Sequence, residues 1–170
     1  MELWDGYRID GTLAGVDIVR GEPIPKGLYF LMVEILVRHI DGDYLLMHRD
    51  PKKKSFPGYL EATAGGAALK GEDPYTAALR ELKEETGITA ERLEPLANMP
   101  YPKARAICHQ FLCITDCPKD SVTLQEGETV GYKWVTESEF VEFVNSNKMI
   151  PTQQERYTEY FKKLGYIKER

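Results

Sequence analysis

The sequence has little of what marks secreted, disulfide-stabilised or membrane-spanning proteins. Its 170 residues include three cysteines, an odd number without a Cys-x-x-Cys pair, which disfavours a disulfide framework and a zinc site and favours a reducing compartment. The N-terminus has no basic start followed by an apolar core, so we expect no secretory signal. The longest apolar run, residues 28–37, contains Glu34 and is too short to span a bilayer. We therefore expect a soluble, cytoplasmic protein with no membrane partner.

Basic residues are also fewer than acidic ones. The chain has 22 Lys and Arg residues against 27 Asp and Glu residues, which gives a formal net charge of −5. This balance argues against a long nucleic acid as a partner, because such binding depends on cations that face the phosphates. An acidic protein that acts on an anionic phosphate compound needs positive charge at the site itself. Basic side chains and a bound divalent cation are the two sources.

The chain has the composition of a folded α/β protein. Apolar residues make up 42% of it, enough for a core, and the length favours one compact domain over residues 1–170. Strand-like runs are mixed with helix-like runs, which favours helices packed on a sheet. The predicted strands are residues 4–9, 28–40, 44–48, 104–115 and 130–135, and the predicted helices are residues 75–86, 136–145 and 152–164.

Turn and cap residues set the boundaries of these elements. Asp41-Gly42-Asp43 separates two strand-like runs and predicts a hairpin. Asp73 as N-cap, Pro74 at the first helical position and Gly87 after the last turn enclose the first predicted helix. The other two helices begin with the Thr-x-x-Glu pattern of a capping box, and these pairs are Thr136 with Glu139 and Thr152 with Glu155.

The most informative stretch runs from Gly66 to Ile88. On a helix, Glu84 and Glu85 stand three and four positions after Glu81, so the three carboxylates share one stripe. Carboxylates this close repel one another. A hard divalent cation such as Mg²⁺ removes that cost, because it takes oxygen ligands and bridges to substrate phosphates.

Neighbouring residues support a ligand site on this stripe. Arg80 stands four positions before Glu84 and can hold a carboxylate by a charge-assisted pair. Gly65 and Gly66 permit a close approach of the backbone to a ligand or metal, and Gly71 permits a turn. Taken alone, a Glu-rich helix after a glycine turn also fits an ordinary solvated helix.

The full spacing resembles the Nudix box, in which glycine, glutamate, Arg-Glu, an aliphatic residue, Glu-Glu, glycine and an aliphatic residue stand at fixed positions. Every constrained position is filled here, by Gly66, Glu72, Arg80, Glu81, Leu82, Glu84, Glu85, Gly87 and Ile88. So complete a match argues against the solvated helix. The resemblance implies a single Nudix hydrolase domain over residues 1–170, with the α/β fold of an α/β/α sandwich around a mixed β-sheet. It also implies a hydrolase that uses Mg²⁺, with Mn²⁺ as the alternative, to cleave a diphosphate linkage in a nucleoside diphosphate linked to another moiety.

The resemblance also assigns roles within the box. Glu81, Glu84 and Arg80 form the implied catalytic set, in which Arg80 orients the glutamates and the identity of the general base stays open. Glu72 supports the metal shell. The implied metal ligands are four oxygen donors: Gly66 through its carbonyl, Glu81, Glu84 and Glu85.

Residues outside the box are candidates for the remaining tasks. Glu126 and Glu128 are candidates for an extra acid that shares the metal, or else belong to a polar turn. Arg49, Lys52 and Lys54 are candidate phosphate-binding residues, or else solvated surface. The expected partner is a small nucleotide or diphosphate substrate that the box does not identify, and a homodimer is compatible with the sequence.

Two rival functions follow from the same resemblance. Ser55-Phe56-Pro57-Gly58 is similar to isopentenyl diphosphate isomerases, but Gly65 stands where those enzymes have a cysteine, and Ala67 and Phe30 stand at histidine positions. A non-catalytic Nudix-like domain that binds a nucleotide as a regulator is the second rival. Such domains usually lose box glutamates, whereas this chain has kept them all. The hydrolase is therefore the favoured interpretation.

Overall fold

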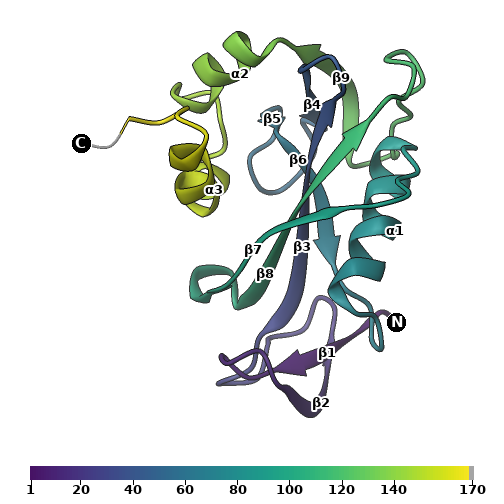
Figure 1. Cartoon of the computed structure of the whole chain (residues 1–170). Helices are drawn as coiled ribbons and strands as arrows, with labels where there is room; N and C mark the ends of the chain where they lie inside the picture. The colour runs from purple at the N-terminus through teal and green to yellow at the C-terminus, as the bar shows by residue number, and fades with distance from the viewer. Residues whose placement is uncertain (169–170) are drawn as a thin grey trace. The chain divides into compact units, whose positions relative to one another are not determined.

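A computed structural model gives the structure of the chain and describes residues 1–168 (Figure 1). Within this range the chain forms nine β-strands, three α-helices and one short 3-10 helix. The strands are β1 (Leu3–Tyr7), β2 (Leu13–Val19), β3 (Phe30–His39), β4 (Tyr44–Arg49), β5 (Leu60–Glu61), β6 (Thr63–Ala67), β7 (Glu94–Tyr101), β8 (Ala106–Thr115) and β9 (Thr129–Val135). The helices are α1 (Pro74–Thr86), α2 (Glu137–Val144), α3 (Pro151–Lys163) and the 3-10 helix η1 (Pro102–Ala104).

The first two strands form an antiparallel hairpin of their own. Leu3 lies opposite Val19 and Trp4 lies opposite Ile18. The sequence predicted the first strand but not the second. The reason is that β2 fully buries only Ile18, so its residues lack the strict alternation by which a strand is recognised.

The other strands form a larger sheet. Hydrogen bonds join them in the order β5-β4-β3-β8-β7, with β6 paired to β3 and β9 paired to β4. The predicted hairpin at residues 41–43 is confirmed, because β3 and β4 are antiparallel with Arg38 opposite Tyr44. The predicted α/β fold class is also confirmed, since the described residues combine three α-helices with a multi-stranded sheet.

The chain divides into two compact units, and the segments of the two units alternate along the sequence. The first unit comprises residues 1–35, 65–84 and 89–113, and the second comprises residues 36–64, 85–88 and 114 onward. In the first unit, Val33 and Leu82 are completely buried. In the second, Tyr44 stacks on Phe140 with ring centroids 4.0 Å apart. A single domain over residues 1–170 stays a prediction.

Besides β2, three further strands were not predicted. β7 contains Pro95 and Pro100 and stands at the end of the strand order. Proline is tolerated at such an edge, where its missing N–H removes no hydrogen bond of the sheet. β5 is two residues long. β6 contains Gly65 and Gly66, which were expected in a loop.

The two later helices differ in how they begin. The predicted capping box of α2 is confirmed, because Thr136 Oγ1 accepts a hydrogen bond from Glu139 N–H and Thr136 N–H donates to the Glu139 carboxylate. The capping box predicted at Thr152 is wrong. α3 starts with Pro151 after Ile150 and has no side-chain cap, since the fixed φ of proline already suits the first helical position.

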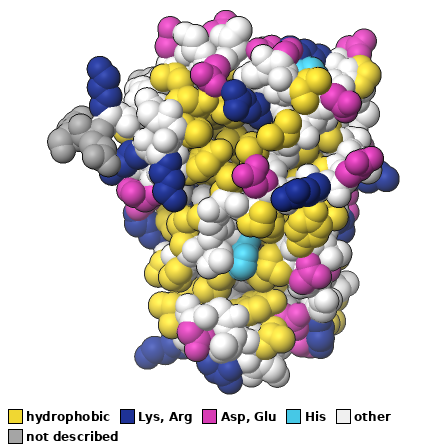
Figure 2. Space-filling view, in the orientation of Figure 1, with side chains coloured by type: hydrophobic (Ala, Val, Ile, Leu, Met, Phe, Trp, Pro, Cys, Tyr) yellow, Lys and Arg dark blue, Asp and Glu magenta, His cyan; other side chains and the backbone are white. Residues whose placement is uncertain are grey.

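Within residues 1–168, no helix is long and apolar enough to cross a membrane, and the three cysteines form no disulfide. Figure 2 shows acidic and basic side chains scattered among one another on the face in view.

Candidate active site

Local signals fix the ends of α1, which carries most of the Nudix-like pattern. Asp73 Oδ1 accepts a hydrogen bond from Thr76 N–H at 2.8 Å, so Asp73 caps the helix. Pro74 occupies the first helical position, and Gly87 follows the last turn with a φ of 75°. The inward face of α1 completely buries Ala77, Ala78 and Leu82. This burial sets the rotation of the helix and so the direction in which its charged residues project.

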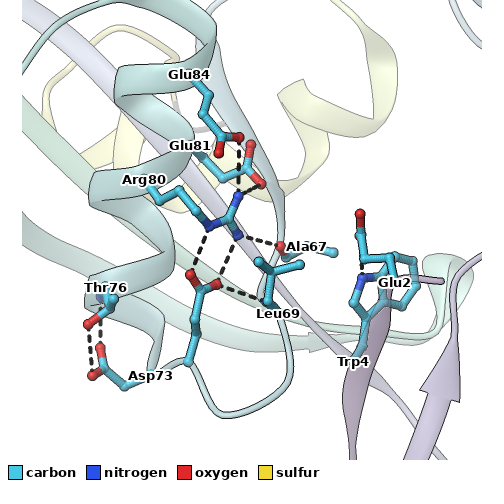
Figure 3. A network of polar contacts seen from close by, with 10 residues as sticks. Glu2, Trp4, Ala67, Leu69, Asp73, Thr76, Arg80, Glu81 and Glu84 are labelled. Atoms are coloured by element: carbon cyan, nitrogen blue, oxygen red, sulfur yellow. Dashed lines mark hydrogen bonds and ion pairs between the residues drawn. The ribbon is translucent and has the colours of Figure 1, made fainter.

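Arg80 lies at the centre of a network that joins α1 to the segment before it (Figure 3). Its Nε and Nη2 atoms donate to the two carboxylate oxygens of Glu72 at 2.8 and 2.9 Å. Its Nη1 atom donates to Glu81 at 2.8 Å and to Glu84 at 3.3 Å. Nη2 also donates to the carbonyl oxygen of Ala67 at 3.1 Å. One guanidinium therefore holds three carboxylates and one carbonyl, and the two-pronged pair with Glu72 is the strongest geometry available to arginine.

The network shifts the proton affinity of its members in different directions. The bond from Arg80 holds the pKa of Glu72 below its ordinary value. Burial raises the pKa of Glu81, and Arg80 offsets only part of that effect. Glu72 raises the pKa of Arg80, so the guanidinium stays charged. A carboxylate with a raised pKa accepts a proton more readily than an ordinary glutamate, which suits the role of a general base.

The two glycines before the loop are required by close contacts within the protein. A Cβ atom on Gly66 would lie 2.6 Å from Glu81 Oε1, and a Cβ atom on Gly65 would lie 2.2 Å from the Val33 carbonyl oxygen. Gly65 was expected to permit approach of a ligand, but its neighbour is the backbone of β3. Gly66 does face the site, because it leaves room for the Glu81 carboxylate.

The structure brings together most of the predicted metal ligands of α1. Glu81 and Glu84 share the Nη1 atom of Arg80, and Glu85, the next residue of α1, is buried. Among residues 1–168, no three His, Cys, Asp or Glu side chains are gathered as a ready-made metal site. The donors nevertheless fit a hard cation, because they are carboxylate oxygens on one helical stripe beside the glycine that makes room for Glu81.

The candidate acids outside the box lie in the turn before β9. Glu126 is exposed. Glu128 forms an ion pair with Lys53. Glu128 N–H also donates to the carbonyl of Gln125 at 3.1 Å, as a turn residue does. A role of either glutamate at a metal stays a prediction.

The candidate phosphate-binding residues differ in how many of their donors are already in use. Arg49 forms an ion pair with Glu61 and donates to the carbonyl oxygens of Phe56 and Ser55 at 3.2 and 2.7 Å. Its guanidinium therefore fixes the loop that follows β4. The side chains of Lys52 and Lys54 are exposed.

Glu34 on β3 is a buried acid outside the Nudix-like pattern. Its side chain is 4% exposed. Cys108 Sγ and Gln110 Nε2 lie 3.5 and 3.4 Å from Glu34 Oε2. The signal was present in the sequence, since a charged residue within an apolar strand is rare unless it is paired.

Comparison with known proteins agrees with this geometry. The NUDIX domain family matches residues 29–160. The chain is 30% identical over 151 residues to an uncharacterised Nudix hydrolase of Listeria monocytogenes, with 89% of each chain covered. It is 31% identical over 119 residues to an isopentenyl-diphosphate Delta-isomerase of Corynebacterium diphtheriae, with 65% of each chain covered. A crystal structure from Deinococcus radiodurans matches with a TM-score of 0.75 and 21% identity, covering 93% of this chain and 98% of that one, and it shows a shared fold.

Proposed function

Because the chain belongs to the Nudix hydrolase family, we propose that it uses a divalent metal to cleave a diphosphate linkage in a nucleoside diphosphate joined to another moiety. The observation that carries this proposal is the network in which Arg80 joins Glu72, Glu81 and Glu84. An ordinary solvated helix has no need to draw three carboxylates onto one guanidinium. The network supports a site in which these oxygens are held ready for a cation.

The residues that would hold the metal are the carboxylates of Glu81, Glu84 and Glu85 and the carbonyl oxygen of Gly66. Mg²⁺ is the favoured ion and Mn²⁺ the alternative, because both take oxygen ligands. When bound, such an ion stabilises charge on phosphoryl oxygens and lowers the pKa of a bound water.

The protein's own residues perform the remaining tasks. Arg80 keeps the carboxylates in place and offsets part of their mutual repulsion. Glu81 would act either as a metal ligand or as the group that takes the proton of the attacking water, and its pKa, which burial raises, supports the second role. Glu72, with its lowered pKa, stays ionised and anchors Arg80. Glu126 and Glu128 remain candidates for a further acid.

Recognition of the substrate is assigned to exposed basic residues. We propose that Lys52 and Lys54 attract the diphosphate, because their exposed ammonium groups are available to it. Arg49 is a weaker candidate, since its guanidinium donors already bind Glu61 and two carbonyl oxygens.

One feature of the structure argues against the isomerase. The residue that aligns with the catalytic cysteine of those enzymes is Gly65, where even a Cβ atom would lie 2.2 Å from the Val33 carbonyl oxygen. A cysteine there requires the backbone to move. The intact glutamates argue in the same way against a purely regulatory domain.

A substrate panel tests the proposed function. The full chain is incubated with nucleoside triphosphates, ADP-ribose, nucleotide sugars, dinucleoside polyphosphates and isopentenyl diphosphate, each with Mg²⁺, with Mn²⁺ and with a chelator. Binding, released phosphate species and isomerised product are measured. Metal-dependent release of nucleoside monophosphate from at least one compound is expected. Isomerisation of isopentenyl diphosphate without hydrolysis, or binding of nucleotides without turnover, contradicts the proposal.

A further inference from the structure

The β1–β2 hairpin lies outside the part of the chain that matches the NUDIX domain family, which begins at residue 29. It nevertheless contacts the loop of residues 68–73, which connects β6 to α1. Lys70 N–H donates to the Leu3 carbonyl oxygen at 2.9 Å. Gly71 N–H donates to Asp5 Oδ2 at 2.7 Å. The hairpin thus supplies hydrogen-bond acceptors to two successive backbone amides of this loop.

The loop also forms bonds toward the site. Leu69 N–H donates to Glu72 Oε2 at 2.8 Å, and the same carboxylate binds Arg80 by two hydrogen bonds. Gly71 precedes Glu72 directly and has a φ of 83°, a backbone conformation that only glycine adopts without cost. The position of Glu72, and through it that of Arg80, therefore depends on where this loop is held.

The hairpin is itself firmly attached beside the site. Trp4 stacks on Phe30 of β3 with ring centroids 4.7 Å apart, and its indole N–H donates to Glu2 at 2.8 Å. Figure 3 shows Trp4 and Glu2 on the side of the site where Ala67 lies. The hairpin can therefore act as a rigid support for the loop.

We propose that the β1–β2 hairpin is a working part of the active site and that Asp5 is a positioning residue. Asp5 fixes the Gly71 amide, which holds Glu72 and Arg80 in register with the metal-binding glutamates. The proposal rests on the proposed function, since it predicts weaker metal binding and slower turnover when the contact is lost. The Asp5 side-chain oxygen accepts the Gly71 N–H directly, so a single acceptor can serve this purpose.

Three variants of the full chain test the role of Asp5. Asp5→Ala removes the acceptor, and Asp5→Asn keeps an acceptor oxygen while removing the charge. Asp10→Ala is the matched control, because Asp10 accepts a backbone bond from Thr12 at 2.9 Å in the same hairpin and bonds only within its turn. Asp5→Ser, too short to reach Gly71, replaces Asp5→Ala if that variant does not fold.

Mg²⁺ binding is measured by calorimetry without substrate, and kcat is measured over a Mg²⁺ titration with the best substrate of the panel. Supporting groups around metal ligands contribute about 10–100-fold to affinity or activity, and Asp5 is one step further from the metal. We therefore expect Asp5→Ala to weaken Mg²⁺ binding and raise the half-activating Mg²⁺ concentration by about 5–10-fold. Asp5→Asn and Asp10→Ala should stay within about twofold of the parent chain.

Two results would overturn the role of Asp5 alone. The first is parental Mg²⁺ binding and turnover in Asp5→Ala. The second is an equal loss of Mg²⁺ binding and turnover in Asp10→Ala, which would show that any weakening of the hairpin has the same effect. A parent chain that hydrolyses no diphosphate in the panel contradicts the proposed function and, with it, this inference. The parent measurement therefore separates the two failures.

Discussion

Arg80 has more charged partners than any other residue of the site. It contacts Glu72, Glu81 and Glu84 and also the carbonyl oxygen of Ala67. The spacing of four positions predicted its pair with Glu84, and that bond is present at 3.3 Å. Its shorter bonds to Glu72 were not predicted, because they depend on how the loop returns to the helix. Spacing along a helix reveals neighbours on that helix, whereas contacts across a loop require the folded chain.

Gly65 and Gly66 are adjacent but should respond differently to a methyl group. In Gly66→Ala the new Cβ atom meets the carboxylate of Glu81, which is flexible, so Glu81 moves and the chain stays folded. In Gly65→Ala it meets the backbone of Val33, which cannot move as easily. We expect Gly66→Ala to lose about 10–100-fold in turnover with little change in unfolding free energy.

Gly65→Ala should instead lose about 1–3 kcal/mol of unfolding free energy, as overpacked sites do. Urea unfolding and steady-state kinetics on both variants check the pair. Equal behaviour of the two variants would contradict the different contacts assigned to them.

At the scale of elements, the start of α2 gives a prediction with an internal control. Thr136 caps α2 through a reciprocal capping box with Glu139, whereas Thr152 lies inside α3 and caps nothing. Thr136→Ala should therefore lower the unfolding free energy by about 1 kcal/mol. Thr152→Ala should change it by less than about 0.5 kcal/mol. A larger loss of unfolding free energy for Thr152→Ala, measured by urea unfolding, would contradict this assignment and support the capping box predicted at Thr152.

Strand β8 carries a histidine that should make stability depend on pH. Burial lowers the pKa of His109 below its ordinary 6.5, so below that pH the unfolded chain binds a proton that the folded chain excludes. The stability that this histidine contributes is present above about pH 6.5 and is lost as the pH falls through the lower folded pKa. His109→Gln removes this dependence.

Urea unfolding of the parent and His109→Gln chains between about pH 5 and 8 measures the effect. The parent should lose stability relative to the variant as the pH falls. A difference between the two chains that stays constant over this range would contradict the burial assigned to His109.

The elements also show which parts of the fold are readable from the sequence. α1 was predicted because Asp73, Pro74 and Gly87 are local signals that lie within one segment. β7 was missed because its prolines disfavour a strand until the strand is placed at the edge of a sheet, which depends on pairing with β8. Helix boundaries that are set by residues of one segment can therefore be predicted from the sequence, whereas strand pairing between distant segments cannot.

At the scale of the whole molecule, a chain with a net charge of −5 belongs to a family that acts on anionic substrates. The positions of a few basic side chains explain how this is possible. Arg80 offsets the carboxylates of the site, and Lys52 and Lys54 remain exposed. The candidate site was largely predictable because the Nudix box is continuous in sequence. The support that we assign to the β1–β2 hairpin was not, since Asp5 and Gly71 are 66 positions apart.

The central claim is that the glutamates of α1 form a metal-dependent hydrolytic site, and Glu84→Gln tests it most directly. Glu84 is exposed and its bond to Arg80 is long, so the variant should stay folded. Glu91→Gln, at an exposed position outside the network, is the control. With saturating Mg²⁺ and the best substrate, we predict that kcat falls by at least about 100-fold in Glu84→Gln with an unchanged Tm, while Glu91→Gln keeps the parental rate. A parental rate in folded Glu84→Gln would contradict the account.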